Sequence, residues 1–85
     1  MRAEVAGIDY RYVVILEPED GAFNVVVPAL PEVATFGKSV EDARLMARDA
    51  ITLALEYRRS RGIEIPPSDE STARVETISI SLPAA

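Results

Sequence analysis

The chain has 85 residues, enough for one small domain, and its 48% hydrophobic and 27% charged residues exclude a disordered tail. Cysteine and histidine are both absent, which excludes disulfides, thiolate nucleophiles and the commonest metal ligand. Fourteen acidic residues against nine basic ones give a net charge of −5, which argues against a duplex-DNA binder and favours a basic partner.

A β-hairpin is predicted near the N-terminus, after a lead-in at residues 1–9 that carries little pattern. Residues 10–17 are rich in β-branched and aromatic side chains, and residues 22–27 are similar, so each range predicts a strand. Between them, residues 18–21 read Pro-Glu-Asp-Gly, which is typical of a turn between antiparallel strands. We therefore expect the two strands to pair.

A third strand and a long helix follow the hairpin. Two prolines close to Leu30 interrupt backbone pairing, and residues 33–36 then predict a short strand. Ser39 is the expected N-cap of a helix over residues 40–61, and Gly62 is its expected left-handed end. The second half of the domain is therefore dominated by one helix.

The last predicted element is a strand over residues 74–82, reached by a loop over residues 63–72. Apolar and polar side chains alternate in this strand, which gives it one apolar face and one wet face. The resulting order is β-β-β-α-β, an α+β fold with a small antiparallel sheet and one long helix packed on one face. Residues 10–82 form the predicted domain, residues 83–85 are a short tail, and no DNA-binding domain is expected.

The predicted hairpin has apolar side chains on both faces, whereas one helix covers only one of them. We expect the uncovered face to carry Val13, Ile15 and Val26, or the residues of opposite parity, and to contact another protein chain. The alternative is that residues 1–9, or the loop around Pro66, fold over this face.

The predicted helix carries an apolar stripe made mainly of alanines, opposite a charged face. Leu45 lies among the charged side chains on this projection. An isolated exposed leucine is common in proteins, but a contact with a neighbouring chain also accounts for it. Leu45 therefore joins Val13, Ile15 and Val26 as a candidate for self-association.

No set of residues predicts catalysis or a metal site. Ser39 is accounted for as a cap, and no histidine is present to activate a serine. Asp42, Asp49 and Glu56 share a helix face, but successive members are about 10 Å apart, too far to bind one ion. The basic cluster at residues 58–61 can contact RNA phosphates, yet capping of the helix accounts for it more simply. We predict a protein that is not an enzyme and needs no cofactor.

Four segments, read in order, resemble the HicB family of antitoxins. They are residues 12–17, 20–23, 27–31 and 35–43, and the resemblance extends over residues 10–82. It implies an incomplete RNase H-like fold with the β-β-β-α-β order. It also implies a partner, a HicA toxin, which is a small basic RNase that cuts messenger RNA and is neutralised by binding.

The chain departs from the family pattern in two places. Glu32 stands where the family usually has glycine, which predicts a differently shaped loop after Leu30. Many relatives also carry a C-terminal DNA-binding domain, whereas this chain ends three residues after its last predicted strand. Direct DNA binding is therefore not expected.

The leading hypothesis is a cytoplasmic, non-enzymatic binding module that self-associates and masks a HicA-like toxin. Phe23, Leu30 and Phe36, near the proline-bracketed loop, are the candidate toxin contacts. The alternatives are a small RNA-binding or remnant RNase H-like protein, and an orphan HicB-like protein without a toxin. No membrane contact is expected, because no apolar run approaches the roughly 20 residues that span a bilayer.

Overall fold

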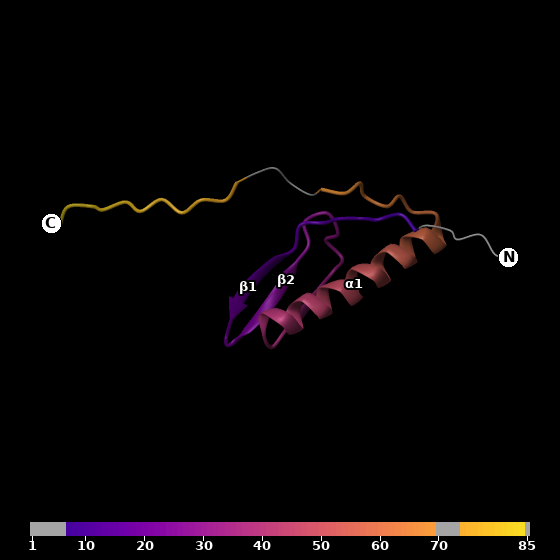
Figure 1. Cartoon of the computed structure of the whole chain (residues 1–85), viewed down its shortest axis with the longest axis horizontal. Coiled ribbons are helices and arrows are strands. Elements are labelled where there is room, and N and C mark those ends of the chain that lie inside the picture. Colours follow the sequence, from indigo (N-terminus) through magenta and orange to yellow (C-terminus); the bar gives the residue numbers. More distant parts are fainter. Residues whose placement is uncertain (1–6, 70–73, 85) are drawn as a thin grey trace.

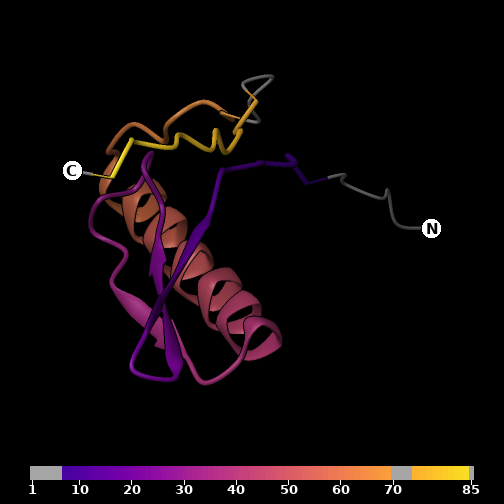
Figure 2. The same cartoon turned by 90° about the vertical axis from the view of Figure 1, so that its left-hand side faces the viewer.

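The computed structural model describes residues 7–69 and 74–84. Within these ranges the chain forms strands β1 (Ile15–Glu19), β2 (Ala22–Val26) and β3 (Thr35–Gly37), followed by helix α1 (Val40–Arg61). The strands make an antiparallel sheet in the order β1-β2-β3, and α1 lies along one face of it (Figures 1 and 2). The predicted α+β class is confirmed.

A two-residue turn at Asp20 and Gly21 joins β1 to β2. Both residues have positive φ, 50° and 80°, and Glu19 pairs with Ala22 across the turn. This is the geometry whose twist matches that of the flanking strands. The turn is shorter than predicted, because Pro18 belongs to β1, where an edge position tolerates its missing N–H.

The first strand begins at Ile15 and not, as predicted, at residue 10. Ile15 pairs with Val26, so Val14 would face Val27, and the residues before it would face Pro28 and the turn that follows. Proline has no N–H to donate to a ladder. The turn then leads the chain away from β1, with the Leu30 N–H donating to the Val27 carbonyl at 2.9 Å. Pairing with β2 therefore stops at Ile15.

Helix α1 has the predicted bounds, and local caps define both. The Ser39 side-chain oxygen accepts a hydrogen bond from the Asp42 N–H at 3.0 Å. At the other end Gly62 adopts φ 68°, and the Ile63 N–H donates to the Arg58 carbonyl at 2.8 Å. The left-handed glycine satisfies carbonyl groups that the last turn would otherwise leave unpaired.

The core lies between α1 and the sheet and is built largely from small aliphatic residues. Its buried members are Val25, Val27, Leu30, Val33, Ala43 and Ala47. The alanines let α1 approach β3 so closely that Gly37 is buried against the first turn of the helix. A side chain at Gly37 would collide with the Ala43 backbone, its Cβ lying 2.2 Å from the Ala43 nitrogen.

The predicted fourth strand is not formed. Residues 74–82 are extended, but they pair with no strand and project from the body of the molecule (Figure 1). Val75, Ile78, Ile80 and Leu82 are between 78% and 98% exposed. Alternation of apolar and polar residues predicts an extended backbone, but a strand also needs a neighbour to bond with. The structure therefore shows the predicted extended backbone but no neighbouring strand paired with it.

A candidate protein-binding face on the sheet

The face of the sheet turned away from α1 carries a group of apolar side chains. Residues that pair directly in an antiparallel sheet share a face, and faces alternate along each strand. Ile15 pairs with Val26, and Asn24 pairs with Phe36. Ile15, Val26 and Phe36 therefore share this face, and Val13 continues the alternation before β1. We call these four residues the outer face.

The structure leaves the outer face open. Phe36 is 56% exposed, Ile15 43% and Val26 37%, while Val13 is half-buried. The residues of the opposite parity pack against the core, among them Val14, just before β1, Leu16 in β1 and Phe23 in β2. The first of the two predicted sets is therefore the one that the helix leaves uncovered.

Within the described residues, the loop around Pro66, the predicted alternative cover, bonds to the chain that precedes β1 and not to the rest of the outer face. The Tyr12 hydroxyl donates to the Pro66 carbonyl at 2.6 Å, and the Val13 N–H donates to the Asp69 carboxylate at 2.8 Å. Ile15 and Val26 stay exposed beyond these contacts. The other alternative, residues 1–9, falls mostly outside the described residues.

Acidic side chains border the outer face at the hairpin end. Glu17 pairs with Asn24 and so lies on the same face, as does Glu19 two residues later. Both are exposed, and the Asn24 amide donates to the Glu19 carboxylate at 2.8 Å. Asp20 adds a third carboxylate at the turn. An apolar surface with carboxylates along one side is suited to a partner that is apolar at its contact and basic around it.

The three candidate toxin contacts do not lie together. Phe36 belongs to the outer face, whereas Phe23 packs half-buried against the core on the helix side. Leu30 is 0% exposed. A partner cannot touch Leu30 without unfolding the loop that holds it, so its predicted contact role is corrected to a core role. Among the three, only Phe36 offers a large free surface.

Leu45 occupies a separate surface, on the side of α1 away from the sheet. It is 59% exposed, and Leu53, two helical turns further on, is 67% exposed. The residues predicted for self-association are thus divided between two surfaces. Three of them share the outer face with Phe36, and the fourth lies on the helix.

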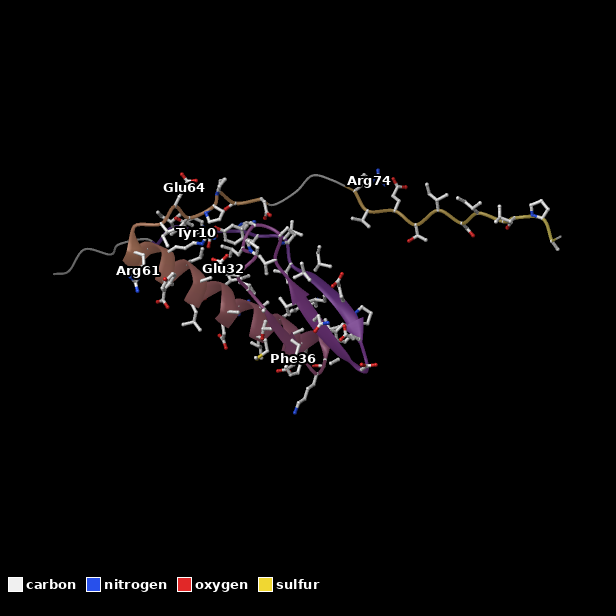
Figure 3. All side chains as sticks on the ribbon, turned by 180° about the vertical axis from the view of Figure 1, so that it is seen from behind. Tyr10, Glu32, Phe36, Arg61, Glu64 and Arg74 are labelled. Carbon is white, nitrogen blue, oxygen red and sulfur yellow. The ribbon has the colours of Figure 1, made fainter. Side chains whose placement is uncertain are left out.

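A bidentate ion pair ties the proline-bracketed loop to the last turns of α1. Arg58 donates from Nε and Nη2 to the two carboxylate oxygens of Glu32, at 2.8 and 3.0 Å. Its remaining Nη1 donates to the Glu64 carbonyl at 2.8 Å, near the C-terminal end of the helix (Figure 3). Arg58, one arginine of the basic cluster that the RNA-binding alternative invoked, is thereby engaged in contacts within the fold.

The pairing of Glu32 with Arg58 was not anticipated from the sequence, although Glu32 stood out as a departure from the family pattern. Hydrogen bonds from Arg58 hold the pKa of the Glu32 carboxyl below its usual value. The residue that replaces the family's glycine thus fastens the loop to α1.

We expect Glu32→Gln to lower the free energy of unfolding slightly at about pH 7 and to have a smaller effect at about pH 3. The lowered pKa means that the ionised carboxylate stabilises the fold above its unfolded pKa. This contribution is lost as pH falls through the folded pKa. The pair is partly exposed, so the effect is small and shrinks with added salt. Urea unfolding of both proteins at the two pH values measures it.

Glu56→Gln is the matched control, because Glu56 lies exposed on α1 and makes no side-chain hydrogen bond among the described residues. An equal loss of stability for Glu32→Gln at both pH values would show that the ion pair does not carry the effect.

Neither metal-binding nor membrane-spanning features stand out in the part of the chain that the structure describes. Within residues 7–69 and 74–84, no group of three or more acidic side chains gathers as a metal site would require. Among the same residues no helix combines the length and apolar character of a membrane-crossing segment. The outer face is consequently the surface on which a function can be argued.

Comparisons with known proteins point to one family. A family model described as a HicB-like antitoxin of bacterial toxin–antitoxin systems matches residues 9–85. Antitoxin HicB 2 of Photorhabdus laumondii subsp. laumondii is 37% identical over 67 residues, covering 78% of this chain and 48% of that protein. Antitoxin HicB 1 of the same organism is 42% identical over 57 residues, covering 66% and 37%. The chain thus spans less than half the length of these two relatives.

Proposed function

Because the chain belongs to the family of HicB-like antitoxins of bacterial toxin–antitoxin systems, we propose that it is an antitoxin that binds and masks a HicA-like toxin. Such a toxin is a small basic RNase that cuts messenger RNA, and masking it requires binding and no chemistry. The observation that carries the proposal is the open outer face with its acidic border. The protein would act in the cytoplasm, where messenger RNA is translated.

The charges and the apolar residues have different parts in this binding. Glu17, Glu19 and Asp20 attract a basic protein and orient its approach, which raises the association rate. Ile15, Val26 and Phe36 then lose their contact with water, which supplies affinity. Phe36 is the most exposed of the three and offers the largest side chain to a partner.

We also propose that the protein self-associates. The outer face cannot hold a toxin and a second copy at once. We assign it to the toxin on the strength of its acidic border. Leu45, on the separate surface of α1, is then the predicted residue left for contact with a second copy.

We expect Phe36→Asp to weaken toxin binding by at least about tenfold and to abolish the rescue of growth in cells that express the toxin. The reason is that a carboxylate would be buried in an apolar contact facing a partner, and desolvating it costs free energy. Affinity is measured by calorimetry with a purified HicA-like toxin, and rescue by colony counts.

Leu53→Asp is the control, because Leu53 is also well exposed, at 67% against 56% for Phe36, but lies on α1, away from the sheet. Circular dichroism shows whether both variants keep their fold. Full rescue by folded Phe36→Asp would contradict the assignment of the outer face to the toxin. A gene without a neighbour encoding a small basic protein would instead favour an orphan antitoxin-like protein.

A further inference from the structure

Residues 74–82 form a projecting segment that we call the arm. Ile78, Ile80 and Leu82 lie on one side of it, and the intervening residues are threonine and serine. All three apolar side chains are at least 78% exposed. Figure 3 shows Arg74 at the start of the arm, which extends away from the sheet and the helix. A single amphipathic strand of this kind is not stable in water by itself, so the arm requires a neighbour.

The sheet offers one edge suited to such a strand. β1 pairs with β2 only, so in the described residues its second edge has no strand beside it. Unpaired N–H and C=O groups at a sheet edge are a template for another extended chain. Pro18 removes one donor near the end of β1 and leaves the rest of the edge available.

A groove lies next to the start of this edge, beside the residues that lead into β1. It has a volume of about 530 Å³ and lies between α1 and the chain leading into β1. Val14, Ile51 and Leu55 are among its apolar lining residues, and Arg44 and Arg48 line it as well. A strand added beside β1 would direct every second side chain toward this groove. The apolar side of the arm has the matching spacing.

One acidic residue of the arm can meet the basic residues of the groove, and Arg74 shares its side of the arm. Glu76 has the same parity as Ile78 and so projects from the same side of the extended arm. Arg44 and Arg48 supply the positive charge that this carboxylate would meet.

Contacts at Asp69 hold the chain that precedes the arm beside the residues before β1. The Asp69 N–H donates to the Arg11 carbonyl at 3.0 Å, and the Val13 N–H donates to the Asp69 carboxylate at 2.8 Å. Bonds to the residues on either side of Tyr12 are the pattern of parallel pairing. Here, however, a side-chain oxygen takes the place of the backbone carbonyl. The described pairing thus ends at Asp69, and residues 74–82 pair with no strand of their own chain among the described residues.

From these observations we propose that two copies of this chain exchange arms. The arm of each copy adds as a strand to the β1 edge of the other and places Ile78, Ile80 and Leu82 in its groove. Nine extended residues span roughly 30 Å, enough to cross to a second molecule. Reciprocal exchange of this kind closes into a two-fold dimer. It is independent of the partner that binds the outer face.

The first test is the oligomeric state of the full chain, measured by analytical ultracentrifugation over a wide range of protein concentration. The wild type is expected to dimerise, and Ile78→Asn with Ile80→Asn to raise the dimer dissociation constant at least about 100-fold. Thr77→Asn with Ser79→Asn changes the wet side of the arm and is expected to leave the dimer unchanged. A wild type that stays monomeric, or isoleucine substitutions that leave the dimer dissociation constant unchanged when Leu45→Asp removes the other proposed contact, would overturn the proposal.

The second test identifies the edge that each arm occupies. The chain has no cysteine, so no native thiol reacts with a cross-linker. Glu17→Cys therefore marks β1, and Ser79→Cys marks the arm. Chains carrying one or the other substitution are mixed and treated with a short bismaleimide cross-linker. A cross-linked pair of unlike chains is expected. Cross-linking confined to single chains in the protein that carries both substitutions would show that each arm binds its own edge, which overturns the exchange.

Discussion

Gly37→Ala is expected to leave the protein largely unfolded. The Cβ of an alanine at this position would lie 2.2 Å from the Ala43 nitrogen and 2.4 Å from its Cα. Both are backbone atoms in the first turn of α1, so no side-chain rotation relieves the collision. Separating β3 from α1 would open the core around Ala43, which is 0% exposed. We expect a loss of at least about 4 kcal/mol, a large part of the stability of a small domain.

The measurement is far-ultraviolet circular dichroism together with urea unfolding. Gly7→Ala is the matched control, since a Cβ at Gly7 has no neighbour within 4 Å. A folded Gly37→Ala protein with an unchanged urea midpoint would show that α1 and β3 can separate at little cost.

The elements that the sequence predicts best are those defined by close neighbours. The bounds of α1 depend on Ser39 at one end and Gly62 at the other, and each acts within four residues of itself. The hairpin depends on the short turn at Gly21, which requires positive φ. Such features can be predicted from the sequence because the residues that determine them are close to them in the chain.

Features that depend on distant neighbours are not readable in the same way. Arg58 was predicted as a helix-terminal charge, and its partner Glu32 lies 26 residues away. The arm has the pattern of a strand, but whether it pairs depends on an edge elsewhere in the molecule or in another one. Burial of Leu30 likewise depends on how the proline-bracketed loop folds over the core.

The sequence predicted which hairpin residues share the outer face, but it did not predict that Phe36 joins them. Alternation within the hairpin identified Val13, Ile15 and Val26 as one set. Assigning Phe36 to the same face requires its pairing with Asn24, and a shift of one residue would have placed it in the core. The register of β3 is a property of the folded sheet, so the sequence alone could not bring Phe36 to this face.

Leu30→Ala is expected to destabilise the fold by about 2–5 kcal/mol. Leu30 is fully buried, and the loop around it is fixed by two turn bonds. Its own N–H donates to the Val27 carbonyl at 2.9 Å, and its carbonyl accepts from the Val33 N–H at 3.0 Å. Because these bonds hold the loop in place, the cavity left by the lost side chain cannot easily collapse. Urea unfolding measures the loss.

Phe36→Ala is the matched comparison, since it removes a larger side chain from a nearby but exposed position. We expect it to change stability by less than about 1 kcal/mol and yet to weaken toxin binding. The folded fraction of Leu30→Ala should bind the toxin with unchanged affinity, because Leu30 supports the loop from inside. Weaker toxin binding by the folded fraction of Leu30→Ala would identify Leu30 as a toxin contact. It would contradict the separation between core and outer face.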